Sequence, residues 1–210
     1  MPMNLKEPIL VLANGAYPTH ETPLSLLKKA ESIVCLDGAA NNLAKNNMKP
    51  DLIIGDLDSI TSEYKNQYSE IIIHDNRQDE NDLRKALLWL NQNNYKKITI
   101  LGATGIREDH TLANIFSILE INLNLDIKIV TDYGIFQIIT NEKEISSFKG
   151  QQVSLFTLNS NTKITTKNLK YELNSKSFEN LYSGTLNEST KNVFYIKSNN
   201  GKTLLYTTHK

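Results

Sequence analysis

The chain has 210 residues, with 23 Lys and Arg and 23 Asp and Glu, so its formal net charge is zero. This length allows one large domain or two modest ones. The balanced charge gives no sign of a nucleic-acid partner or of binding to an anionic membrane surface. The single cysteine excludes an internal disulfide. No apolar segment approaches transmembrane length and residues 1–8 lack the apolar core of a signal peptide, so we expect a cytoplasmic protein.

From residue 9 to about residue 132, short apolar runs alternate with segments of helical spacing. Apolar residues at helical intervals follow Pro23, Asp82 and Asp109 and predict helices there. Buried strands that alternate with amphipathic helices predict an open, mostly parallel, Rossmann-like sheet with helices on both faces. The expected strands are 9–13, 32–36, 52–54, 70–74, 97–101 and 127–131.

Beyond about residue 134 the pattern changes to short strands separated by Asn, Ser, Gly and Lys, without a long amphipathic helix. Such a pattern predicts a small all-β sandwich or barrel. We therefore divide the chain into an α/β domain, residues 1–138, and an all-β domain, residues 139–210. The expected strands of the second domain are 135–140, 152–158, 163–166, 193–197 and 203–207.

The most informative stretch is 50–59, in which an apolar run ends at Gly55 and is followed by Asp56, Asp58 and Ser59. Two carboxylates at positions i and i+2 of extended chain project to the same side. Like charges held that close repel each other unless a cation or a shared proton lies between them. The simpler interpretation is a turn rich in Asp; a site for a hard cation such as Mg²⁺ is the one we favour.

Two further polar clusters follow predicted strands. Asp37 and Asn41 enclose a Gly-Ala-Ala turn after the strand 32–36, where they either cap a helix or approach a ligand. Gln78, Asp82 and Lys85 belong to an acidic helix start, and Asp82 and Lys85 share a helix face. A carboxylate for a metal and an ammonium for a phosphate would be the functional interpretation of that pair.

The last cluster, 102–110, links the strand 97–101 to a helix and contains Gly102, Arg107, Asp109 and His110. Glycines at a helix start expose backbone N–H groups to an anion, and an arginine binds phosphate in a bidentate manner. There is no Walker A motif and no Gly-x-Gly-x-x-Gly motif. Carboxylates with basic groups and no His or Cys ligand set favour Mg²⁺ bound to a polyphosphate.

These four clusters, in this order and spacing, resemble the thiamine pyrophosphokinase family over nearly the whole chain. In the second domain, 168–173 resembles the family's Gly-Leu-x-Tyr/Trp-x-Leu stretch and 185–188 its Ser-Asn-Glu segment. The chain departs from the pattern at Ala39 and Ile106, where the family commonly has Gly, and at Leu186, where Ser is usual. The last departure bears on thiamine binding.

The resemblance implies an α/β ATP-binding domain, a β-sandwich and a homodimer with shared active sites. It implies transfer of the pyrophosphoryl group of ATP to thiamine, with Mg²⁺ and release of AMP. It implies metal-binding and catalytic roles for Asp56, Asp58 and Asp82, a catalytic role for Arg107, and thiamine contacts from Asn187, Tyr171 and Tyr182. The ATP contacts that it implies are Asp37, Asn41, Ser59, Gln78, Lys85, Gly102, Arg107, Asp109 and His110.

Two alternatives remain open at this stage. One is the same chemistry on another alcohol, such as a hydroxymethylpterin, because the first domain alone does not identify the acceptor. The other is a nucleotide- or thiamine-binding protein without catalysis, although a binding protein has little need for three converging carboxylates.

Overall fold

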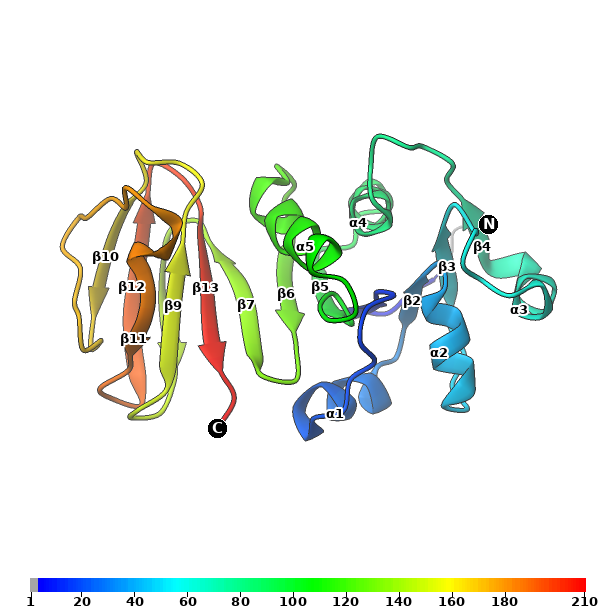
Figure 1. The fold of residues 1–210 in the computed structure, drawn as a ribbon, viewed down its shortest axis with the longest axis horizontal. Helices are drawn as coiled ribbons and strands as arrows, with labels where there is room; N and C mark the ends of the chain where they lie inside the picture. Colours follow the sequence, from blue (N-terminus) through cyan, green and yellow to red (C-terminus); the bar gives the residue numbers. More distant parts are fainter. Residues whose placement is uncertain (1–3) are drawn as a thin grey trace. The chain divides into compact units, whose positions relative to one another are not determined.

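The computed structural model describes residues 4–210 and divides into two compact units, Met1–Asp132 and Tyr133–Lys210 (Figure 1). Residues 1–3, at the start of the segment in which we found no signal peptide, lie outside the described residues. The first unit is an α/β fold and the second is all-β. The units divide between Asp132 and Tyr133, whereas the boundary expected after residue 138 falls within a strand, β7.

The first unit is built on six parallel strands in the order β6-β5-β1-β2-β3-β4. All six predicted strands are confirmed, with ends shifted by one or two residues. Every residue of β1, β2 and β3 is buried, as expected for a sheet covered on both faces. The strands are β1 (Ile9–Leu12), β2 (Ile33–Leu36), β3 (Leu52–Gly55), β4 (Ile72–His74), β5 (Lys97–Leu101) and β6 (Asp126–Val130).

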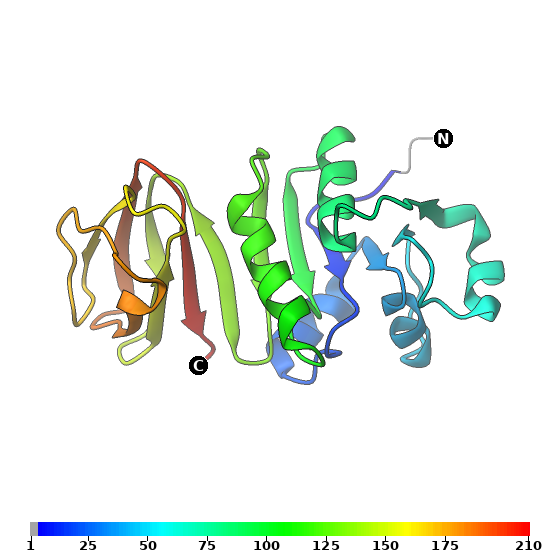
Figure 2. The same ribbon diagram turned by 45° about the horizontal axis from the view of Figure 1, so that its top comes forward.

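Five helices connect these strands. Right-handed crossovers place α1, α2 and α3 on one face of the sheet, and α4 and α5 on the other. Figures 1 and 2 show α4 and α5 side by side. None of the helices among residues 4–210 is long and apolar enough to cross a bilayer. The helices are α1 (Glu21–Lys29), α2 (Ala39–Lys45), α3 (Ser62–Gln67), α4 (Asp82–Gln92) and α5 (Glu108–Glu120).

The sequence did not predict α3, and its burial explains why. This six-residue helix has no buried residue, so it has no apolar periodicity to detect. It is instead defined at its start by Thr61, whose hydroxyl accepts a hydrogen bond from the Tyr64 backbone N–H. A short 3₁₀ helix, η1 (Ser69–Ile71), follows it and leads into β4.

The second unit is an antiparallel β-sandwich. Its strands form one sheet in the order β11-β9-β13-β7 and another in the order β10-β12-β8. Side chains from both sheets, including Val153, Leu155, Ile164 and Phe194, share one buried core, which confirms the predicted sandwich. The strands are β7 (Gly134–Ile139), β8 (Glu142–Ser146), β9 (Gln152–Phe156), β10 (Lys163–Lys167), β11 (Gly184–Glu188), β12 (Val193–Asn199) and β13 (Thr203–Thr208).

Two strands of the sandwich, β8 and β11, escaped prediction. In β8 only Ile145 is buried, so its sequence lacks an apolar alternation. In β11 the register with β9 shifts between Gly184 and Asn187, and Leu186 within the irregularity has a φ of 60°. An irregular edge strand of this kind has no clean period of two in its sequence.

Candidate active site

A pocket of about 490 Å³ lies at the carboxyl edge of the parallel sheet. Segments that follow β1, β2, β3, β4 and β5 all contribute to its lining. The strand order reverses direction between β1 and β5, and ligands of open α/β sheets bind at this kind of switch point. The topology therefore brings together residues that are up to 100 positions apart in the chain.

The segments after β1 and β5 approach each other closely at this edge. The backbone N–H of Gly15 donates to Gly102 O, and that of Ala16 donates to Thr104 O, both at 2.8 Å. A Cβ on Gly15 would lie 2.4 Å from Gly102 O and 2.6 Å from Thr104 O. Only glycine permits such an approach of two backbones at the base of the pocket.

Three carboxylates, Asp37, Asp56 and Asp58, form the acidic part of the pocket. Each offers an oxygen, and these oxygens lie within 4.8 Å of one another. Asp37 also holds the loop after β3, because its carboxylate accepts hydrogen bonds from the backbone N–H groups of Ser59 at 2.9 Å and Ile60 at 3.2 Å. A group of oxygen donors without His or Cys suits a hard divalent cation.

The environment shifts the pKa values of two of these groups in opposite directions. Burial raises the pKa of Asp37, and the nearby Asp58 carboxyl raises it further against the lowering effect of Ser59. The Ser59 hydroxyl, which donates to Asp58 Oδ1 at 2.8 Å, holds the pKa of Asp58 below its ordinary value. Two carboxyls so placed favour a single negative charge until a cation joins them.

Asp82 and Lys85 face the same pocket from the start of α4. Asn81 caps this helix, because its side-chain oxygen accepts the Arg84 backbone N–H at 2.9 Å. Lys85 is only 2% exposed, and its Nζ donates to Asp82 Oδ1 at 3.0 Å. Burial raises the pKa of Asp82, Lys85 lowers it, and the charges of Asp56 and Asp58 raise it.

The segment between β5 and α5 contributes Arg107 and His110 to the lining. Asp109 holds the Arg107 guanidinium through Nε–H to Oδ1 at 3.1 Å and Nη2–H to Oδ2 at 2.5 Å, and Arg107 lowers the pKa of Asp109. Gly102 has a φ of 65°, and a Cβ there would lie 2.5 Å from Ala13 O. Gly102 therefore supports the site through its backbone rather than through a lining atom.

Comparison with known proteins places the chain in a family. The model described as thiamin pyrophosphokinase, catalytic domain, matches residues 24–131, and the model described as thiamin pyrophosphokinase, substrate-binding domain, matches residues 134–206. The chain belongs to the thiamin pyrophosphokinase family. The two family domains coincide closely with the two structural units.

Individual relatives agree with this membership. Thiamine pyrophosphokinase 1 of Oryza sativa subsp. japonica is 31% identical over 215 residues, which cover 88% of this chain and 79% of the rice protein. Thiamine pyrophosphokinase 1 of Arabidopsis thaliana is 29% identical over 79% of this chain and 73% of its own.

Solved structures of the family share the fold. The thiamine pyrophosphokinase from Bacillus subtilis superposes with a TM-score of 0.78 at 19% identity, over 96% of this chain and 99% of its own. The thiamin pyrophosphokinase from Candida albicans gives 0.77 at 22% identity, over 96% and 89%.

The family pattern at residue 106 is a glycine, and the structure shows what its replacement does. Ile106 has a φ of 67° and its side chain is 75% exposed. A β-branched residue in the left-handed region is strained. Ile106→Gly should therefore raise the free energy of unfolding by about 0.5–1 kcal/mol, after the greater unfolded-state entropy of Gly is subtracted. Thermal melting checks this; an unchanged or lower Tm would contradict it.

Among the other predicted ATP contacts, Ser59 and Gln78 line the pocket and Asn41 does not. The Asn41 Nδ2 donates to Ser59 O at 2.9 Å and its Oδ1 accepts the Thr61 N–H at 3.1 Å. Asn41 therefore connects α2 to the loop that carries the acidic residues, which makes it a support of the site in this structure.

The three predicted thiamine residues belong to the second unit. Asn187 is buried, and its amide bonds the backbone of Tyr171, accepting its N–H at 3.1 Å and donating to its carbonyl at 2.8 Å. Tyr171 and Tyr182 are 61% and 72% exposed. The Asn187 side chain thus fixes the segment that carries Tyr171, while both tyrosine rings are free to contact a ligand.

Four lining residues were not among the predicted contacts: Asn14, Arg77, Glu80 and Asn114. Asn14 follows a strand directly, the same position as Asp37, and this signal was available in the sequence. Arg77 and Glu80 lie in a segment whose charges a helix cap could explain. Asn114 is three turns of reasoning away from any motif, because only the packing of α5 brings it to the pocket; its Nδ2 donates to Ala103 O at 2.9 Å.

Proposed function

We propose that this protein transfers the pyrophosphoryl group of ATP to the hydroxyl of thiamine, giving thiamine diphosphate and AMP. The observation that carries the proposal is the convergence of three carboxylates with Lys85 and Arg107 in a pocket of the unit that matches the family's catalytic domain. A triphosphate needs this combination of metal-binding oxygens and fixed cations, since phosphoryl-type transfer depends on placement and charge neutralisation.

A magnesium ion fits the donor set. Asp37, Asp56 and Asp58 bring three carboxylate oxygens within 4.8 Å, and Asp82 is close enough for their charges to raise its pKa. We assign Asp56 and Asp58 as the residues that hold Mg²⁺, with Asp82 completing the set through its free oxygen and Asp37 supporting it. The ion would neutralise charge on the bound triphosphate.

In this reaction the thiamine hydroxyl oxygen forms a bond to the β-phosphorus of ATP, and the bond from that phosphorus to the α–β bridging oxygen breaks. AMP leaves with the bridging oxygen. Arg107 and Lys85 offset the negative charge of the phosphates, which grows on the leaving oxygen. The hydroxyl proton passes to a pocket carboxylate, and Asp82 suits this role because burial raises its pKa.

The second unit would supply the thiamine contacts, from Tyr171, Tyr182 and the segment that Asn187 holds. The match of residues 134–206 to the family's substrate-binding domain supports this assignment. We further propose a cytoplasmic homodimer in which residues of the partner complete each active site, as the family resemblance implies. The sedimentation coefficient of the purified protein tests the dimer.

The reaction is tested by AMP release from Mg²⁺–ATP with and without thiamine. We expect AMP that depends on thiamine, with thiamine diphosphate appearing in equal amount. AMP that appears only with another alcohol, such as a hydroxymethylpterin, would keep the ATP half of the proposal and reject the thiamine half. Binding of ATP and thiamine without any AMP would identify a protein that binds both and has no catalysis.

A further inference from the structure

The chain contains three arginines, and each is paired with a nearby carboxylate: Arg77 with Asp75, Arg84 with Glu80, and Arg107 with Asp109. Two of the three, Arg77 and Arg107, line the pocket. Arg107 was expected there from the family pattern, whereas Arg77 was not. Arg77 enters from the segment after β4, and β4 is separated from β5 by three strands, so the two arginines approach from different sides of the pocket.

The two pocket arginines are held in the same way. Arg77 Nε lies 2.9 Å from Asp75 Oδ1, and its Nη2 lies 2.5 Å from Asp75 Oδ2. Arg107 uses the same two nitrogens toward Asp109. Within residues 4–210, neither guanidinium has another protein acceptor. The Nη1 groups and the second N–H of each Nη2 therefore remain available as donors.

A guanidinium has two edges that can each bind an oxyanion in a bidentate manner. With the Nε–Nη2 edge occupied by a carboxylate, the Nη1–Nη2 edge matches the spacing of two phosphate oxygens. Holding one edge also orients the plane of the group, which reduces the entropy lost when the other edge binds. An arginine held like this is prepared for a phosphate without having to break its first ion pair.

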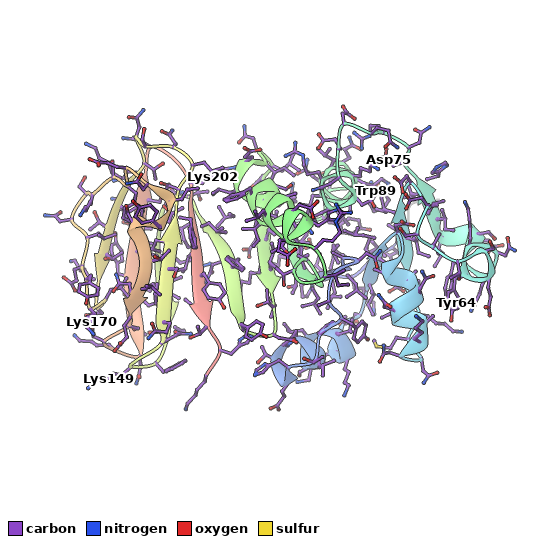
Figure 3. All side chains as sticks on the ribbon, viewed as in Figure 1. Tyr64, Asp75, Trp89, Lys149, Lys170 and Lys202 are labelled. Atoms are coloured by element: carbon purple, nitrogen blue, oxygen red, sulfur yellow. The ribbon has the colours of Figure 1, made fainter. Side chains whose placement is uncertain are left out.

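Asp75 is well placed to give Arg77 this orientation. It follows β4 directly and is labelled in Figure 3. Its backbone N–H donates to Gly55 O at 2.9 Å, which connects it to the end of β3, next to Asp56. Its carboxylate also accepts the Arg77 backbone N–H at 3.2 Å, so one side chain fixes both the turn and the guanidinium. Arg77 holds the pKa of Asp75 at about 2, so the carboxylate stays charged.

We propose that Arg77 is a second arginine for the polyphosphate of ATP, binding the β- or γ-phosphate opposite Arg107, and that Asp75 is its positioning residue. This inference rests on the proposed function. The charges of the pocket support it, because five lining carboxylates face only three fixed cations of the described chain. A triphosphate that enters so acidic a pocket requires every cation that can reach it.

The test is the binding of Mg²⁺–ATP and of AMP to the full chain, measured by isothermal titration calorimetry without thiamine. Arg77→Gln should weaken Mg²⁺–ATP binding by about tenfold or more and AMP binding by less than about twofold, since AMP lacks the β- and γ-phosphates. Arg77→Lys should recover little, because an ammonium cannot bind Asp75 and a phosphate through two parallel edges.

Arg84→Gln is the matched control. Arg84 also pairs with a carboxylate, in the neighbouring helical turn, but it is not a lining residue. This variant should bind Mg²⁺–ATP like the wild type. Asp75→Asn should weaken Mg²⁺–ATP binding by about threefold to tenfold, and it should add nothing to Arg77→Gln in the double variant, since Asp75 acts through Arg77.

The outcomes separate this inference from the proposed function. If the wild type forms AMP with thiamine but Arg77→Gln binds Mg²⁺–ATP as tightly as Arg84→Gln, the function stands and the inference is wrong. Equal losses for AMP and Mg²⁺–ATP would also reject the assignment to the β- or γ-phosphate. A wild type that binds no Mg²⁺–ATP would reject both proposals.

Discussion

Replacing Asp58 by Asn is expected to lower the kcat of thiamine-dependent AMP formation by roughly 10²–10³-fold. Asp58 belongs to the group of three carboxylates that fits a divalent cation, and the neutral amide would offer a much weaker ligand. Its side chain is exposed in the pocket, so the substitution leaves the core unchanged. Initial rates at saturating Mg²⁺–ATP measure the effect.

The same variant should not lose stability in the absence of Mg²⁺. Asp58 raises the pKa of Asp37, and a raised carboxyl pKa gives stability that is present at low pH and is lost as the pH rises through that pKa. Removing the Asp58 charge lowers this cost at neutral pH, so the Tm should stay equal or rise. Added Mg²⁺ should raise the Tm of the wild type and have little effect on the variant.

Asp126→Asn is a suitable control for Asp58→Asn. Asp126 is an exposed carboxylate at the first residue of β6, at the amino edge of the same sheet. Its replacement should leave both kcat and the effect of Mg²⁺ on the Tm unchanged. Wild-type turnover in Asp58→Asn would show that Asp58 holds no essential metal.

Replacing Lys85 by Met should lower kcat/KM for Mg²⁺–ATP by about 10²-fold. Methionine has nearly the volume of lysine, and Lys85 is 2% exposed, so the variant keeps the packing of α4 and removes only the charge. The ammonium that faces the pocket is then no longer available to the phosphates. Lys65→Met, at an exposed position of α3, is the matched control and should be fully active.

The pH dependence of Lys85→Met gives an independent check. Lys85 lowers the pKa of Asp82, against the burial that raises it. Without Lys85 the pKa of Asp82 should rise further, so the acid limb of the pH profile of kcat/KM should move to higher pH than in the wild type. An unchanged acid limb would mean that the protonation of Asp82 does not limit the reaction.

The sequence by itself determined the strand–helix alternation, the antiparallel character of the second unit and the four clusters of polar residues. These features are local: a buried strand has an apolar run, an amphipathic helix has its apolar spacing, and a strand end has its glycine. Elements without such a signal were missed. Helix α3 buries nothing, and β8 buries only Ile145.

Only the tertiary structure decided which polar residues meet. Asp37 and Asp58 come from different strand ends, and the parallel order of β2 and β3 brings their oxygens within reach of each other. The same contact that unites the cluster makes Asn41 a support of the loop rather than a lining residue. Arg77 was in view in the sequence, but its orientation depends on the turn that Asp75 makes after β4. Local patterns predict where a side chain can be polar, whereas the distances between charges depend on contacts between distant segments.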